Sequence, residues 1–366
     1  MNNSLVCILP ALFNNSGHEI DFIDMLSVIA KKKKLKIKFI LPKKNTLKIA
    51  IPHKKELLGS NDANFIIKLF YIIGNFFILI NRLKRLKKDD LVYIDGYSFY
   101  FLISLILYLL INGNLNKLVI WVRYPYDYII KKYIFKFFIY LFNIDSSRQL
   151  ITITENSKLA RVLNKRFSIK IPTLPSHHKI EKIYIKNRKF NNSKINILCP
   201  GSFRPEKYGK NLVNFLEHNI KNKKIFALNI DKKFSNFYKN IYKINIRFFK
   251  NDLKKSEFVN QINNCDLVIL PYNFLDYKLR TSGIFFETIS MGKIVFITSN
   301  TIMSGELKRN NLEKLIVKDW NNISIQKIIK IKNDKLVRKN LIKMKNNYNK
   351  LHGKENLIKE FLRIIK

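Results

Sequence analysis

The stretch INILCPGSFRPEKYG, residues 195–209, joins a run of apolar residues to a basic turn that contains glycine. The apolar run predicts a buried strand, and the residues after the turn predict a helix. Glycine lets the backbone approach a phosphate closely, a helix start offers unpaired amide groups, and Arg204 and Lys207 add two cations. The stretch therefore predicts either an anion-binding loop or, taken alone, a surface connection with solvated charges.

A second strand and a second helix start lie further along the chain and favour the anion-binding alternative. The strand ends at Tyr272, and the helix opens within residues 279–287. Ser282 and Gly283 can supply another anion-binding helix N-terminus, with the hydroxyl of Thr281 beside it. In open parallel sheets, ligands bind beyond the carboxyl ends of the strands, which is where both loops are expected.

Glu287 follows the second helix start by one helical turn. At that distance its carboxylate can accept hydrogen bonds from the two hydroxyls of a ribose. Helix N-termini, two cations and a distal carboxylate together describe a site for a nucleoside diphosphate.

The rest of the chain alternates short apolar runs with helical patterns, the rhythm of parallel sheets covered by helices. The expected strands are residues 5–9, 37–41, 91–94, 118–122, 150–154, 195–199, 224–230, 245–249, 267–270, 294–297 and 315–317. The apolar pattern thins between residues 176 and 194, where we place a domain boundary. We therefore expect an α/β protein with two Rossmann-like, doubly wound domains, residues 1–180 and 181–353, and a terminal helix, residues 354–366, that returns to the first domain.

Three blocks of the second half resemble the donor domain of GT-B glycosyltransferases, in particular the retaining, family 4-like group of bacterial polysaccharide and lipopolysaccharide enzymes. The blocks are the basic loop at residues 201–209, the strand at 264–272 and the helix and strand at 282–295. The resemblance implies two domains that face each other across a cleft, the first for the acceptor and the second for the nucleotide-sugar donor.

The resemblance also implies roles for the donor loops. Arg204 and Lys207 neutralise the diphosphate as it leaves, and Glu287 holds the ribose. One position departs from the family, because Leu279 stands where members carry a second glutamate; Asp276 is close and could substitute. The donor identity therefore stays open. The expected donor-binding residues are Gly201, Ser202, Arg204, Lys207, Tyr272, Thr281, Ser282, Gly283 and Glu287.

The first half has fewer signals for chemistry. Gly17 and His18 follow the first strand and resemble the acceptor-side loop of the same enzymes; His18 orients or deprotonates an acceptor hydroxyl, or is merely exposed. Asp95 and Arg123 follow inner strands, and Arg123 stands where related enzymes often have a histidine. With Asp127, these residues complete the acceptor side, and the stereochemistry stays open. The expected catalytic residues are His18, Asp127, Arg204 and Lys207.

The formal net charge is +42, with 68 Lys and Arg against 26 Asp and Glu. A coding bias toward Lys, Ile and Asn would produce the same composition, but the charge still attracts anionic partners.

Residues 65–80 and 99–111 are apolar but shorter than the about 20 residues of a spanning helix, so we expect buried helices. The first is followed by a basic cluster, which predicts a peripheral contact with an anionic membrane. The cluster comprises Arg82, Lys84, Arg85, Lys87 and Lys88.

The sequence contains neither a disulfide framework nor a metal motif. The three cysteines are far apart, no Asp-x-Asp sequence occurs, and no metal or other cofactor is expected. The first residues predict a strand and not a signal peptide, which favours a cytoplasmic location at the inner face of the cell membrane.

These observations predict a glycosyltransferase of the hexosyltransferase class that transfers a sugar from an NDP-sugar to a lipid-linked or growing saccharide in surface polysaccharide or lipopolysaccharide synthesis. The alternatives are a sugar-nucleotide epimerase with the same fold, and a non-enzymatic basic protein that binds membrane or nucleic acid. Because the lysines are scattered, no specific nucleic-acid partner is expected.

Overall fold

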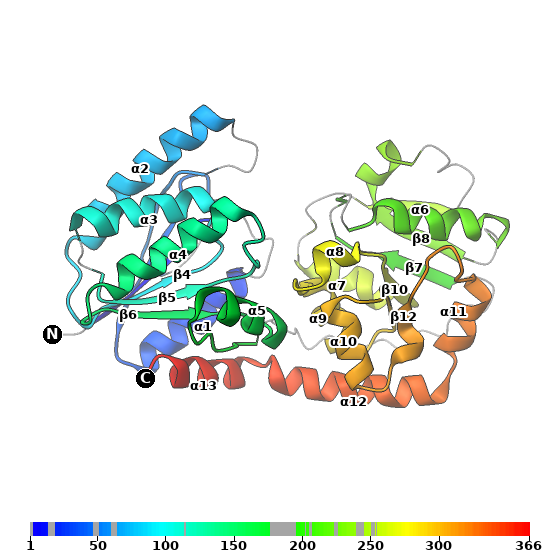
Figure 1. Ribbon diagram of the computed structural model, residues 1–366. Helices are drawn as coiled ribbons and strands as arrows, with labels where there is room; N and C mark the ends of the chain where they lie inside the picture. The colour runs from blue at the N-terminus through cyan, green and yellow to red at the C-terminus, as the bar shows by residue number, and fades with distance from the viewer. Residues whose placement is uncertain are drawn as a thin grey trace. The chain divides into compact units, whose positions relative to one another are not determined.

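Two parallel six-stranded sheets form the framework of the protein. We analysed a computed structural model, which describes residues 3–13, 19–46, 51–59, 64–112, 115–175, 195–201, 203–204, 207–222, 226–238, 245–249, 253 and 255–366. The chain divides into two compact units, Met1–His177 with Lys354–Lys366, and His178–Gly353. Each unit contains one of the sheets (Figure 1).

The first unit has the strand order β3-β2-β1-β4-β5-β6, with every pair parallel. Its apolar runs form the inner strands because both faces of the sheet are covered by helices. The elements are β1 (Ser4–Ile8), α1 (Glu19–Lys32), β2 (Lys36–Pro42), β3 (His53–Leu57), α2 (Phe65–Leu83), β4 (Leu91–Ile94), α3 (Phe99–Asn112), β5 (Lys117–Trp121), α4 (Ile129–Asn143), β6 (Gln149–Ile153), α5 (Ser157–Phe167) and α13 (Lys354–Ile364).

Helices α2, α3 and α4 lie over one face of this sheet, and α1 and α13 lie over the other (Figure 1). Leu357 and Phe361 of α13 are fully buried in the same core cluster as Phe22 of α1 and Tyr93 of β4. The ring of Phe361 meets that of Tyr93 edge-on, with centroids 5.9 Å apart. The last helix of the chain therefore completes the core of the first unit, which is the packing expected from the sequence.

The second unit repeats the arrangement with the order β12-β11-β10-β7-β8-β9, again entirely parallel. Its elements are β7 (Ile195–Cys199), α6 (Gly209–His218), η1 (Ile220–Asn222), β8 (Phe226–Asp231), η2 (Lys232–Asn236), β9 (Ile246–Phe249), α7 (Lys255–Asn264), β10 (Leu267–Leu270), α8 (Phe274–Tyr277), α9 (Gly283–Ser290), β11 (Val295–Thr298), α10 (Ile302–Arg309), η4 (Glu313–Leu315), β12 (Ile316–Val317), α11 (Ile325–Lys332) and α12 (Lys335–Leu351).

These two sheets confirm the predicted doubly wound α/β fold, and each expected strand overlaps an observed one. Strand β3 (His53–Leu57) was not predicted, because its sequence HKKEL is polar. It pairs with β2 at the edge of the first sheet, where Phe39 lies opposite His53. Charged side chains are typical of edge strands, which must avoid pairing with other chains.

The expectation that residues 65–80 form a buried helix is wrong. Helix α2 is, among the described helices, the one long and apolar enough by length and composition to cross a membrane, yet few of its residues are buried. Its buried residues are Ile72, Asn75, Leu79 and Leu83, which form a narrow stripe. Helix α3, by contrast, is largely buried, as expected.

Candidate functional site

The two loops that resemble a diphosphate site follow neighbouring strands of the second sheet. Gly201 follows β7, and α9 follows β10 by way of α8. Strands β7 and β10 are paired, with Leu198 opposite Val268. After β7 the chain continues to β8 on one side, whereas β10 lies on the other. The loops therefore meet at the point where the strand order reverses, the usual ligand position in such sheets.

Gly201 and the first turn of α9 are in close contact. A Cβ atom on Gly201 would lie 2.6 Å from Cδ1 of Ile284 and 3.5 Å from Nζ of Lys207. Gly201 also has a φ of +91°, a conformation that other residues rarely adopt. Glycine at this position thus allows the basic loop to reach the start of α9.

Side-chain hydrogen bonds hold the basic loop in place. The hydroxyl of Tyr208 donates to the carbonyl groups of Pro200 and Gly201, the latter over 3.1 Å. The buried carboxylate of Asp231, at the end of β8, accepts from the amide of Phe203 over 2.7 Å. The amide group of Asn211 spans to β10 and donates to the carbonyl of Tyr272 over 3.2 Å. The loop is therefore fixed by three side chains that sequence reasoning did not assign.

Ser282 is the N-cap of α9. Its hydroxyl accepts a hydrogen bond from the amide of Phe285 and lies 3.1 Å from the hydroxyl of Tyr272. Tyr272 in turn stacks on Tyr277, with ring centroids 4.3 Å apart. Ser282 thus fixes the helix start, and the first amide groups of α9, beginning at Gly283, form the positive end of the helix dipole.

The two predicted cations lie beside these loops. Burial raises the pKa of the Tyr272 phenol well above its usual value, Tyr277 adds to the rise, and the charge of Arg204 opposes it. Burial likewise raises the pKa of the Cys199 thiol, and the charge of Lys207 opposes that rise. Arg204 is exposed and Lys207 is half-buried. The two positive charges therefore act on Cys199 of β7 and on Tyr272, which follows β10.

The remaining donor-side residues are placed as follows. Glu287 is half-buried on α9, one turn after Gly283, and Thr281 is half-buried just before the helix. Leu279 is buried in the second unit, whereas Asp276 on α8 is half-buried. Ser202 lies outside the described residues.

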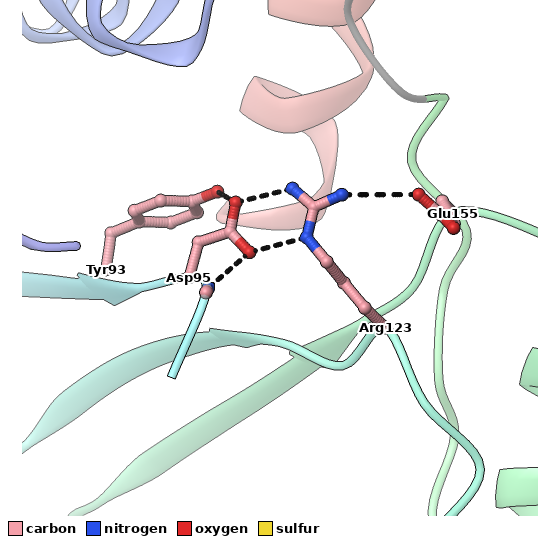
Figure 2. Close-up of polar contacts among 5 residues, drawn as sticks. Tyr93, Asp95, Arg123 and Glu155 are labelled. Carbon is pink, nitrogen blue, oxygen red and sulfur yellow. Dashed lines mark hydrogen bonds and ion pairs between the residues drawn. The ribbon is translucent and has the colours of Figure 1, made fainter. Parts of the chain in front are cut away.

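In the first unit, Asp95 and Arg123 form a buried ion pair with two hydrogen bonds (Figure 2). Nε of Arg123 lies 2.9 Å from Oδ1 of Asp95, and Nη2 lies 2.7 Å from Oδ2. Asp95 is fully buried and also accepts from the amide of Gly96 over 2.7 Å. This geometry is the strong, bidentate form of the arginine–carboxylate pair.

Glu155 is a third member of this network, and sequence reasoning missed it. Its Oε2 atom lies 3.3 Å from Nη1 of Arg123 (Figure 2). The guanidinium also lies over the ring of Trp121, with its Cζ 5.1 Å from the centroid. Asp95, Arg123 and Glu155 follow β4, β5 and β6, so the network gathers the carboxyl ends of three adjacent strands. A search for polar residues directly after strands, the rule that selected Asp95 and Arg123, also selects Glu155.

The other acceptor-side predictions are not joined to this network by the described contacts. Asp127 is exposed and forms an ion pair with Arg166, whose guanidinium also donates to the carbonyl of Tyr126 over 2.9 Å. Gly17 and His18 lie outside the described residues. Within the part of the chain that the structure describes, no three His, Cys, Asp or Glu residues could together hold a metal ion.

Comparisons with solved structures identify the fold. A glycosyltransferase from Rickettsia africae matches with a TM-score of 0.65 and 15% identity, covering 100% of this chain and 98% of its own. WaaG, a glycosyltransferase involved in lipopolysaccharide biosynthesis, matches with a TM-score of 0.63 and 13% sequence identity, and the match covers 99% of each chain. Anabaena Alr3699/HepE, solved with UDP-glucose, matches with a TM-score of 0.66 and 12% sequence identity, and the match covers 98% of this chain and 99% of the HepE chain.

No protein-family model matches the sequence, and no curated protein sequence matches it significantly. The likeness is therefore one of structure, over the full length of both chains and with both sheets included. From the two parallel sheets, the junction of the loops after β7 and β10, and this full-length similarity, we conclude that the chain has the two-domain GT-B fold of these glycosyltransferases.

Proposed function

We propose that this protein is a glycosyltransferase whose second unit binds a nucleotide-sugar donor. The observation that carries the proposal is the close approach of Gly201 to Ile284, which brings the basic loop against the start of α9. An anion at this junction is favoured by the helix dipole and by the charges of Arg204 and Lys207. Anabaena Alr3699/HepE, which shares the fold, has been solved with UDP-glucose.

In the proposed reaction, an acceptor hydroxyl oxygen forms a bond to the anomeric carbon of the sugar. The bond from that carbon to the diphosphate oxygen breaks, and its electron pair stays on the leaving nucleoside diphosphate. The hydroxyl proton passes to a base on the acceptor side, for which His18 and Asp127 are the candidates. Arg204 and Lys207 stabilise the charge on the diphosphate without a metal ion, and Glu287 holds the ribose.

The acceptor that we propose is a lipid-linked or growing saccharide of surface polysaccharide or lipopolysaccharide, at the inner face of the cell membrane. WaaG is involved in lipopolysaccharide biosynthesis, and WaaB is a lipopolysaccharide outer core galactosyltransferase. The basic residues after α2 supply attraction to an anionic leaflet. Arg82 contributes less to this attraction than its neighbours, because it is paired with Glu56 of β3.

Donor binding is tested by thermal unfolding of the full chain with UDP, GDP, CMP and dTDP. A nucleotide present at about 100 times its dissociation constant stabilises the folded state by about 2.7 kcal/mol. We expect one nucleoside diphosphate to raise the melting temperature. If none of the four does so at millimolar concentration, the second unit does not bind a nucleotide donor and the proposal is wrong.

The two cations are tested by Arg204→Ala and Lys207→Ala. We expect each variant to lower turnover with the identified donor by at least ~100-fold, because each removes a positive charge that acts on the leaving diphosphate. Lys221→Ala is the matched control, since Lys221 is exposed on η1, which follows the C-terminal end of α6 in the same unit. Full activity in both loop variants would place the donor elsewhere.

A further inference from the structure

Exposed large apolar side chains are concentrated in one part of the first unit. Among the described residues of that unit, all of them lie between positions 65 and 144, on or next to α2, α3 and α4. Single exposed apolar residues are normal on a soluble surface, but a cluster of this kind marks an interaction site.

Helix α2 presents an apolar stripe away from its own buried side. Ile66, Phe70, Ile73 and Phe77 follow one another at spacings of four, three and four, so they lie on one face of the helix. All four are more than half exposed, Phe70 being 66% exposed. The opposite face, with Ile72 and Leu79, packs into the unit, so the exposed stripe is not used to cover the described core of that unit.

Helix α4 presents a second stripe of the same kind. Ile130, Tyr133, Phe137 and Tyr140 recur at spacings of three, four and three, and Ile130 is 68% exposed. Phe135, Phe138, Ile139 and Phe142 form its buried side.

The two stripes belong to one layer of the molecule. Helix α3 packs against both α2 and α4, and all three lie over the same face of the sheet (Figure 1). The sides of α2 and α4 that turn away from the sheet therefore point to the same side of the unit. We call the two stripes, Ile66 to Phe77 of α2 and Ile130 to Tyr140 of α4, the α2/α4 face.

Charge on these helices is of one sign. The sequences of α2, α3 and α4 contain no Asp or Glu. Lys68 lies on the side of α2 that packs on α3, and Lys131, Lys132 and Lys136 flank the apolar stripe of α4. The ammonium group of Lys131 lies 4.9 Å from the centroid of the Tyr128 ring, and that of Lys68 lies 5.3 Å from the Tyr100 ring. Both ammonium groups therefore make cation–π contacts with aromatic rings of this layer.

This composition fits an anionic bilayer better than a second protein. Protein interfaces are depleted in lysine, whereas helices that lie at a membrane surface combine lysine on their flanks with aromatic and aliphatic residues on their buried side. Tyrosine, which carries two of the four positions of the α4 stripe, is enriched at the boundary between headgroups and acyl chains.

We infer that the α2/α4 face inserts into the headgroup boundary of an anionic membrane. This deepens the proposed function, on whose membrane location it rests, by naming the surface that enters the lipid. Helix α2 lies on the membrane and does not cross it, because it is tied to the unit at two points. The amide of Asn75 exchanges hydrogen bonds with the backbone of Leu58, at 2.8 and 2.9 Å, and the hydroxyl of Ser104 donates to the carbonyl of Ile72 over 2.9 Å.

Flotation with vesicles tests this inference on the full chain. The vesicles are phosphatidylcholine alone or with about a third phosphatidylglycerol. We expect binding to the anionic vesicles, and a loss of at least about tenfold in Phe70→Gln/Phe77→Gln and in Ile130→Asn/Phe137→Gln, since each pair removes two inserted apolar side chains. The matched control is Leu336→Gln/Ile342→Gln, two equally exposed apolar residues of α12 in the second unit.

A second set of variants distinguishes insertion of the α2/α4 face from the general attraction of a basic protein to anionic lipid. We expect Lys131→Gln/Lys132→Gln/Lys136→Gln to lower anionic vesicle binding at least about tenfold. Lys339→Gln/Lys343→Gln/Lys350→Gln on α12 removes the same charge from another surface and should change binding little. Equal losses in the two triple variants would show that net charge alone holds the protein and would overturn the inference.

Two further outcomes would also overturn it. One is a wild-type chain that floats with neither kind of vesicle. The other is a wild-type dimer in gel filtration that the α2 and α4 variants convert to monomers, which would make the face a contact between copies. Nucleotide-induced thermal stabilisation is measured on the same variants and should be unchanged. If nucleotide does not stabilise the wild-type protein, the proposed donor site is refuted but the membrane surface is not.

Discussion

Gly201 has no room for a side-chain carbon. Its φ is +91°, and a Cβ would lie 2.6 Å from Ile284. We expect Gly201→Ala to lower the free energy of unfolding by about 1–2 kcal/mol, the cost of a left-handed conformation, and to weaken nucleotide binding because the loop moves away from α9. Urea unfolding and nucleotide titration measure the two effects.

The control for this substitution is Gly209→Ala. Gly209 begins α6, and a Cβ there would meet nothing within 4 Å. Alanine has a higher helix propensity than glycine, so this variant should be as stable as the wild type or more stable. Equal stabilities of the two variants would contradict the strained geometry at Gly201.

Because the carboxylate of Asp95 is buried against Arg123, replacing Arg123 should lower the free energy of unfolding strongly. Arg123→Met leaves the carboxylate of Asp95, which is fully buried, without its cation. We expect a loss of about 3 kcal/mol in the free energy of unfolding, measured in urea. Arg363→Met, which breaks an exposed pair with Glu360 in the same unit, should cost less than about 1 kcal/mol.

At the scale of elements, the sequence predicts best those strands that are buried on both faces. Residues 91–94, 195–199 and 267–270 are strands with the expected bounds, because a continuous apolar run between turns has few other structures in an α/β domain. Helix α5 likewise begins at a preferred N-cap residue, Asn156, whose side chain accepts from the amide of Leu159. Here the local sequence and the packing require the same structure.

Elements whose environment is decided by distant residues were not predictable in the same way. Strand β3 exists because it pairs with β2, not because of its own polar sequence. Helix α2 is apolar on nearly all sides, so its pattern does not reveal which face packs on α3. The approach of the two loops was expected only from the rule that ligands bind beyond the carboxyl ends of parallel strands. Tyr208 and Asp231, which support the basic loop, had no role assigned from the sequence.

At the scale of the whole molecule, the net charge of +42 affects the stability of the fold. With 68 basic residues against 26 acidic ones, repulsion between like charges exceeds attraction and destabilises the compact state. We expect the melting temperature to rise with sodium chloride and to level off at a few tenths molar, since the Debye length falls from about 30 Å at 0.01 M to about 3 Å at 1 M. Scanning calorimetry across this range measures the rise.

An osmolyte such as sucrose provides the comparison for this experiment. It stabilises proteins by exclusion from their surface, so its effect continues to grow with concentration. A melting temperature that falls or stays constant between low and moderate salt would mean that attractive pairs outweigh the repulsion.

The return of α13 to the first unit also has a consequence for biosynthesis. Leu357, Ile358, Phe361 and Ile365 fill a core whose other buried members come from residues 5–174, and the ammonium group of Lys117 donates to the carbonyl of Ile365. The ribosome must therefore synthesise the whole second unit, His178–Gly353, before the half that it made first can close its interior. Until that moment the nascent first unit leaves a patch of core uncovered, while the whole second unit emerges behind it.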